Sequence, residues 1–137
     1  MTTTLDYRDN EPLSVPEPAL SLLSQAERGL ADAGLEPDPA RRFAQAYLAA
    51  LRGGAAVLAM RGRPHRANAR PTSVWTLLAS VAPELREWAA FFASWSATRA
   101  SVQAGITRAV TPRSADDLVR QAGQFLDLVT RAIHGTS

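Results

Sequence analysis

Two residue types are absent from this sequence of 137 residues, cysteine and lysine. Without cysteine the chain forms no disulfide, has no thiol nucleophile and binds no zinc or iron–sulfur cluster through thiolates. Without lysine it has no G-x-x-x-x-G-K-[ST] phosphate-binding loop, and a G-x-G-x-x-G motif is also missing. The only histidines are His65 and His134, which do not have the spacing of a metal site. We therefore expect no metal, no cofactor and no catalytic residue.

Strand-like patterns and long apolar runs are also missing. The sequence contains no strand alternation and no Asn-Gly hairpin turn. Its most apolar stretches, residues 55–60 and 88–95, are much shorter than the ~20 residues that span a bilayer. The first residues are polar and lack the basic and apolar regions of a secretory signal. These features predict a cytoplasmic protein without a membrane segment.

The charged residues that are present are unevenly distributed. All 15 basic residues are arginine, and the net charge is only +2. Residues 1–38 hold two arginines and eight acidic residues, whereas residues 39–83 hold seven arginines and no acidic residue. Residues 84–137 are nearly balanced, with six arginines and five acidic residues. The position of the arginines, more than their number, therefore indicates where an anionic partner would bind.

Apolar residues recur at three- and four-residue spacing in four long segments, which is typical of amphipathic helices. The predicted helices cover residues 16–34, 39–61, 83–102 and 114–134, with a short helix over 74–81 after an N-cap at Ser73. Such stripes, joined by short loops, bury their apolar faces only against one another. The sequence therefore predicts an all-α, antiparallel up-and-down bundle of four to five helices over residues 16–137. Residues 1–15 are expected to be a disordered tail.

Two further patterns concern the core of the bundle. Gly53 and Gly54 lie side by side in the second predicted helix, where small residues favour a close approach of neighbouring helices. Trp75, Trp88 and Trp95 lie in phase with apolar neighbours, so we expect them to pack in the core.

The segment RGRPHRANARP, residues 61–71, is the most distinctive feature and is predicted to be a loop. Its side chains suit charge-assisted hydrogen bonds to phosphate oxygens, but no aromatic residue is interleaved for base stacking. Two interpretations stay open, a surface for an anionic partner and a solvated loop. The candidate nucleic-acid or anion-binding residues are Arg61, Arg63, His65, Arg66 and Arg70.

Three runs of residues carry a resemblance to a known family: RRFAQAYLAALRGGAAVLAMRGRP (41–64), PTSVWTLLASVAPELREWAAFF (71–92) and AVTPRSADDLVRQAGQFLDLV (109–129). They resemble the actinobacterial branch of the HEPN domain superfamily, and the similarity extends over about residues 17–134. The resemblance implies a HEPN-like bundle of four or five helices that is often a homodimer.

Many HEPN proteins are metal-independent endoribonucleases, in which an arginine followed a few residues later by a histidine acts on RNA. The positions for that arginine are residues 58–60 before His65 and residues 127–129 before His134, and none is an arginine. Arg61 and Arg131 are too close to the two histidines. We therefore expect a non-enzymatic member.

The sequence and the resemblance together lead to one main hypothesis and two alternatives. We expect a non-enzymatic interaction module, a homodimer that binds nucleic acid or a protein partner. The resemblance links this branch to gene neighbourhoods of error-prone DNA polymerases, and so to DNA repair or a stress response. The alternatives are a ribonuclease with a rearranged site that uses His65 or His134, and an antitoxin-like scaffold whose apolar helix face meets a partner chain.

Overall fold

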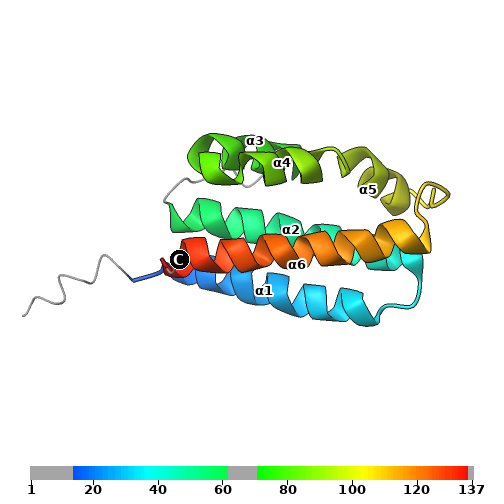
Figure 1. The fold of residues 1–137 in the computed structure, drawn as a ribbon, viewed down its shortest axis with the longest axis horizontal. Helices are drawn as coiled ribbons and strands as arrows, with labels where there is room; N and C mark the ends of the chain where they lie inside the picture. Colours follow the sequence, from blue (N-terminus) through cyan, green and yellow to red (C-terminus); the bar gives the residue numbers. More distant parts are fainter. Residues whose placement is uncertain (1–13, 62–70, 136–137) are drawn as a thin grey trace, which may run out of the picture.

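The computed structural model describes residues 14–61 and 71–135, and every regular element in these ranges is helical. The elements are α1 (Glu17–Leu35), α2 (Pro39–Met60), α3 (Pro71–Val81), the 3-10 helix η2 (Pro83–Leu85), α4 (Arg86–Ala93), α5 (Ser96–Gln103) and α6 (Pro112–His134). The long helices α1, α2 and α6 pack alongside one another, and α3 and α4 lie on the other side of α2 (Figure 1). The predicted all-α bundle is thus confirmed for the described part of the chain.

Helix α2 is the central element, since α1, α3, α4, α5 and α6 all contact it. Its start is the one that the sequence predicts: Asp38 is the N-cap and its Oδ2 accepts a hydrogen bond from the backbone N–H of Arg41 at 2.9 Å. Pro39 follows at the first helical position, where the missing N–H leaves no hydrogen bond unmade. The helix ends at Met60, one residue before the predicted end.

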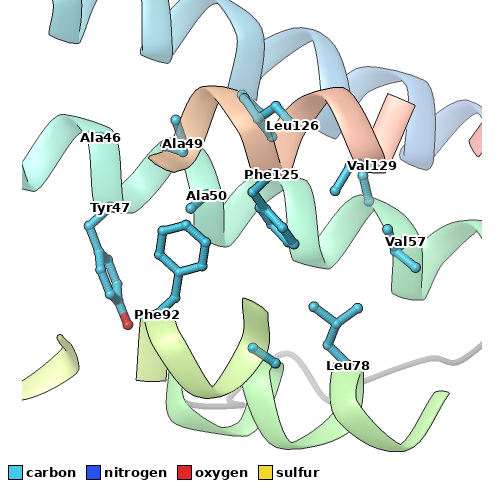
Figure 2. Close-up of a cluster of buried hydrophobic side chains, with 14 of the residues drawn as sticks. Ala46, Tyr47, Ala49, Ala50, Val57, Leu78, Phe92, Phe125, Leu126 and Val129 are labelled. Atoms are coloured by element: carbon cyan, nitrogen blue, oxygen red, sulfur yellow. The ribbon is translucent and has the colours of Figure 1, made fainter. Parts of the chain in front are cut away.

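The aromatic centre of the core is Trp75, which is 2% exposed. Its ring stacks on Phe92 at 5.3 Å between centroids and meets Phe125 edge-on at 6.1 Å. Its indole Nε1 donates a hydrogen bond to the hydroxyl of Tyr47 at 2.9 Å, so this buried donor is satisfied. Figure 2 shows Tyr47, Phe92 and Phe125 gathered between α2, α4 and α6. Trp88, like Trp75, packs with this cluster, as the sequence predicts.

Gly53 and Gly54 allow two helices to approach α2 at the same level. A Cβ atom on Gly54 would lie 3.2 Å from the Trp75 ring, and one on Gly53 would overlap Cδ2 of Leu126. The first contact is with α3 and the second with α6, so the glycine pair lies where α2 is approached from both sides. The predicted close approach is confirmed.

The prediction of one continuous helix over residues 83–102 is wrong. The structure has η2, α4 and α5 instead, with a break at Ser94 and Trp95. At the break the hydroxyl of Ser94 donates to the carbonyl oxygen of Phe91 at 2.6 Å, which gives this carbonyl a partner outside the helical ladder. The bend places the Trp95 ring edge-on against Phe43 at 5.5 Å, although its buried indole N–H has no hydrogen-bond acceptor among the described residues.

Three predicted boundaries also differ from the structure. Helix α3 begins at Pro71, ahead of the predicted cap at Ser73. Helix α6 begins at Pro112 because Thr111 is its N-cap, and Ser114 is the reciprocal partner in a capping box instead of the first residue. The predicted tail, residues 1–15, lies outside the described residues except for its last two, and Val15 packs partly against the core.

The sequence-based estimate of apolar length also needs correction. Helix α2 as a whole is long and apolar enough to cross a membrane, which the shorter stretches 55–60 and 88–95 do not reveal. More than half of that apolar window is buried inside the molecule, and the core helix of a soluble protein meets the same criterion. This is therefore weak support for a membrane span.

Candidate functional site

The predicted site is the arginine-rich loop that follows α2. Arg63, His65, Arg66 and Arg70 lie outside the residues that the structure describes, so their role in anion binding stays a prediction. Arg61 is described and is the C-cap residue of α2.

The guanidinium of Arg61 already has partners within the protein. Its Nη2 donates to Oε2 of Glu84 at 2.6 Å, and its Nη1 donates to the carbonyl oxygen of Val81 at 3.1 Å. The hydrogen bond from Arg61 lowers the pKa of Glu84. Arg61 therefore ties the end of α2 to the junction of α3 and η2, and the Glu84 carboxylate competes with any phosphate for this guanidinium.

At the other end of α2, Arg42 closes the turn between α1 and α2. Its Nη1 donates to Oδ1 of Asp116 in the first turns of α6 at 2.9 Å, and its Nε donates to the carbonyl oxygen of Glu36 at 2.9 Å. The neighbouring Arg41 pairs through Nε with Oε2 of Glu36 at 3.3 Å. The backbone N–H of Asp38, and after it Arg41, lowers the pKa of Glu36.

These ion pairs change the interpretation of the acid-free block, residues 39–83. Four of its arginines are described, and Arg41, Arg42 and Arg61 each have a carboxylate partner from outside the block. In the described part of the chain, the block is therefore largely neutralised by folding. Arg52 is the exception, because no described carboxylate lies within ion-pair distance of it.

Among the described elements, helix α2 has one side that is directed away from α1, α3 and α6. Ala49 faces α1, Gly53 faces α6 and Gly54 faces α3. Because successive residues of a helix are rotated by about 100°, one arc of α2 lies outside these three directions. That arc holds Ala44, Leu48, Leu51, Ala55 and Ala59, all of them partly exposed, and Leu51 at its edge also packs partly against the core. We refer to these five residues as the open face of α2.

Two half-buried arginines border the open face. Arg52 follows Leu48 by one turn, on the side toward α1. On the side toward α5, the guanidinium of Arg99 lies over the ring of Tyr47, 5.3 Å from its centroid. Tyr47 precedes Leu51 by one turn of α2. The open face is therefore apolar along its centre and positively charged at its borders.

Tyr47 itself does not provide a base. Burial raises the pKa of its hydroxyl, against the opposing effects of the hydrogen bond from Trp75 and the charge of Arg99. The phenol consequently stays neutral at physiological pH, and its oxygen accepts the Trp75 hydrogen bond. Its role in the described structure is to support Trp75 and Arg99.

The second histidine, His134, is the last residue of α6 and is exposed. Gly135 follows in the left-handed conformation, with φ of 70°, and its N–H bonds the carbonyl oxygen of Arg131. Arg131 and His134 thus lie in the last turn of α6, where positive charge interacts favourably with the helix dipole, as the sequence predicts for His134. No group of three metal-binding side chains occurs among the described residues.

Sequence reasoning missed the open face and its two bordering arginines. The residues 44, 48, 51, 55 and 59 have helical spacing, yet the same helix has a second apolar stripe that faces the core. Only the contacts of α2 show which stripe is buried. The position of Arg99 over Tyr47 could not be predicted, because it depends on the break at Trp95 between α4 and α5.

The fold defines the class of protein: an all-α bundle arranged around one central helix. Residues 33–130 match the family described as SAV_6107-like HEPN, and the chain therefore belongs to the HEPN superfamily. The match begins at the end of α1 and stops before Arg131 and His134. No curated protein and no solved structure has significant similarity to the chain. The sequence resemblance to HEPN proteins is thus confirmed, whereas the actinobacterial branch stays a prediction.

Proposed function

We propose that this protein is a non-enzymatic, cytoplasmic HEPN module that binds another protein through the open face of α2. The observation that carries the proposal is the apolar character of that face on the central helix of the bundle. A helix that meets water normally carries polar residues on its outer side, and an apolar side is typical of a helix that packs against a further element.

Two observations support the non-enzymatic part of the proposal. The family's Arg–His motif is missing at both histidines in the sequence, and Arg61, the arginine nearest to His65, is occupied by Glu84 and Val81. A direct test is incubation of the purified protein with RNA in the presence of a metal chelator. We expect intact RNA, whereas cleavage that is lost in His65→Ala or His134→Ala would establish the ribonuclease alternative.

The ion pairs within the described part of residues 39–83 favour a protein partner over nucleic acid at this block. Carboxylates neutralise three of the four described arginines in residues 39–83, so the described part of this block offers only Arg52 to phosphates. Titration of the protein with labelled DNA and RNA at low and moderate salt tests whether nucleic acid is the partner. We expect weak binding. Tight binding that falls steeply with salt and is lost when Arg63, Arg66 and Arg70 are replaced by Ala would favour nucleic acid instead.

Site-specific photocrosslinking tests the protein-binding face itself. A photoreactive phenylalanine analogue is placed at Leu48 or Ala55 in the full chain expressed in its source cells, with position Gln124 on the exposed side of α6 as the matched control. We expect one crosslinked protein from positions 48 and 55 that is missing at position 124. The proposal is wrong if positions 48 and 55 give no crosslink, or only those that position 124 also gives.

A further inference from the structure

We infer that the occupant of the open face of α2 is an amphipathic helix of a partner protein whose apolar stripe is flanked by acidic residues. This inference rests on the proposed function and specifies the partner chemistry of the same face. Three features of the described residues support it: the spacing of the face, its two unpaired arginines, and the absence of acidic residues from α2.

The spacing of the open face fits a helical partner. From Ala44 to Ala59 the face extends over 15 residue steps, which corresponds to about 22 Å of helix at 1.5 Å per residue. Its successive intervals of four, three, four and four residues form a seam like that of two packed helices. Alanine at three of the five positions lets a second helix approach to the usual 8–10 Å between axes.

The two arginines that border the open face indicate that the partner helix carries negative charge. Of the arginines that the structure describes, only Arg42, Arg52 and Arg99 are half-buried. Arg42 pairs with Asp116, but neither Arg52 nor Arg99 has a carboxylate within ion-pair distance among the described residues. A partly desolvated guanidinium without a carboxylate lacks the charge-assisted hydrogen bonds that it forms best. Acidic residues on either side of the partner's stripe would supply them.

A second copy of this chain does not provide such a partner at this face. Helix α2 carries no acidic residue, so a symmetric α2–α2 contact would bring only arginines together. In an antiparallel pair centred at Leu51, the two Arg52 side chains would lie close to the two-fold axis and repel each other. The apolar centre and basic borders also suit an anionic lipid surface, but α1, which packs against α2, carries exposed acidic residues, Glu27 and Asp32 among them, that oppose it.

The probes for the test are three synthetic peptides of about 20 residues, long enough to form helix in isolation. They share Leu and Ala at the stripe positions and differ only in the flanking residues, which are Glu, Gln or Lys. Vesicles of anionic phospholipid serve as a fourth probe. Binding to the full-length protein is measured by fluorescence anisotropy for the peptides and by co-sedimentation for the vesicles. The variants are Arg52→Glu and Arg99→Glu, with Arg86→Glu, an exposed residue of α4, as control.

We expect the Glu peptide to bind about tenfold more tightly than the Gln peptide, which corresponds to one ion pair of about 1.4 kcal/mol. The Lys peptide should bind most weakly. Arg52→Glu or Arg99→Glu should reduce the difference between the Glu and Lys peptides, while Arg86→Glu should leave it unchanged and circular dichroism should show intact helix in all variants. Equal affinity for the Glu and Lys peptides, no binding of any peptide, or binding of the vesicles alone would overturn the inference. The photocrosslinking experiment tests the proposed function separately. A crosslinked partner segment that is basic or non-helical would support the proposed function and contradict only the inference about the partner's chemistry.

Discussion

The two longest helices, α2 and α6, bury one side against the same core but differ on the other side. Helix α6 presents a regular series of exposed polar side chains to water, namely Arg113, Asp116, Arg120, Gln124, Asp127 and Arg131. Helix α2 presents alanine and leucine at the corresponding positions. Both helices bury an apolar stripe, as amphipathic helices do. Only α6 also carries polar residues on its outer side, which is usual for a helix that faces water.

The comparison separates the requirements of folding from those of binding. The core requires one apolar side of each helix, and α6 shows that the chain is able to place charges on the other side. Apart from Leu51, the residues of the open face of α2 are not among the partly buried apolar residues that pack against the core. This is the side on which we propose that a partner binds.

The largest expected effect tests the core side of α2. Trp75→Ala removes the ring that stacks on Phe92 and the donor that bonds Tyr47. We expect a loss of about 3–5 kcal/mol in the free energy of unfolding, since a large buried side chain leaves a cavity. Chemical denaturation measures it. Trp75→Phe, which retains a ring but loses the hydrogen bond, should cost clearly less; an equal cost would assign the effect to the hydrogen bond.

A matched pair of substitutions compares the two sides of α2 directly. Gly53→Leu introduces a side chain where even a Cβ atom overlaps Leu126, and overpacking of this kind costs about 1–3 kcal/mol. Ala55→Leu, two residues later on the open face, should change stability by no more than about 0.5 kcal/mol. Thermal unfolding of both variants checks the contrast. Similar destabilisation by the two would mean that the open face is not free for a partner.

A charge on the open face should affect binding without affecting folding. Leu48→Glu places a carboxylate four residues before Arg52, where an i,i+4 pair contributes about 0.3–0.5 kcal/mol and compensates for the lost apolar contact. We expect stability within about 0.5 kcal/mol of the unmodified protein and loss of the photocrosslink at position 55. Gln124→Glu on α6 is the control and should retain the crosslink. Retention of the crosslink in Leu48→Glu would place the contact elsewhere.

The smallest expected effect concerns the ion pair at the end of α2. Arg61 lowers the folded-state pKa of Glu84 below its usual value of 4.5, so the pair stabilises the fold above that pH. As the pH falls through the lowered pKa, Glu84 is protonated and this contribution is lost. Because the pair is largely exposed, we expect less than about 1 kcal/mol. Stability measured from pH 7 to pH 3 should fall less in Glu84→Gln and in Arg61→Gln than in the unmodified protein; an unchanged slope would contradict the pairing.

Much of the fold follows from local patterns in the sequence. The cap at Asp38, the proline after it and the stripe that follows define α2 to within one residue, because these determinants act over a few neighbouring positions. The break at Ser94 is not predictable in the same way. The apolar spacing continues in phase across it, and what the bend gains is a contact between Trp95 and Phe43, some fifty residues earlier in the chain.

The candidate site was less predictable because it depends on contacts between distant residues. The sequence shows seven arginines without an acidic neighbour in residues 39–83, but it does not show that Asp116 and Glu84 come to Arg42 and Arg61 in the fold. Arg52 has no such partner among the described residues. That difference is a property of the folded chain and has no local pattern in the sequence.

The glycine pair has a consequence for how this chain tolerates changes in length. Tyr47 and Gly54 both meet Trp75, and Gly53 meets Leu126 between them, so the number of residues that separates these contacts is fixed. Deletion or insertion of a single residue between Tyr47 and Gly53 would turn the rest of α2 by about 100° about its axis. The turn would move the glycines away from their neighbours, and an insertion before Arg52 would bring this arginine to the position that now faces Leu126. Variation in length is therefore to be expected in the connections between helices, and not within α2.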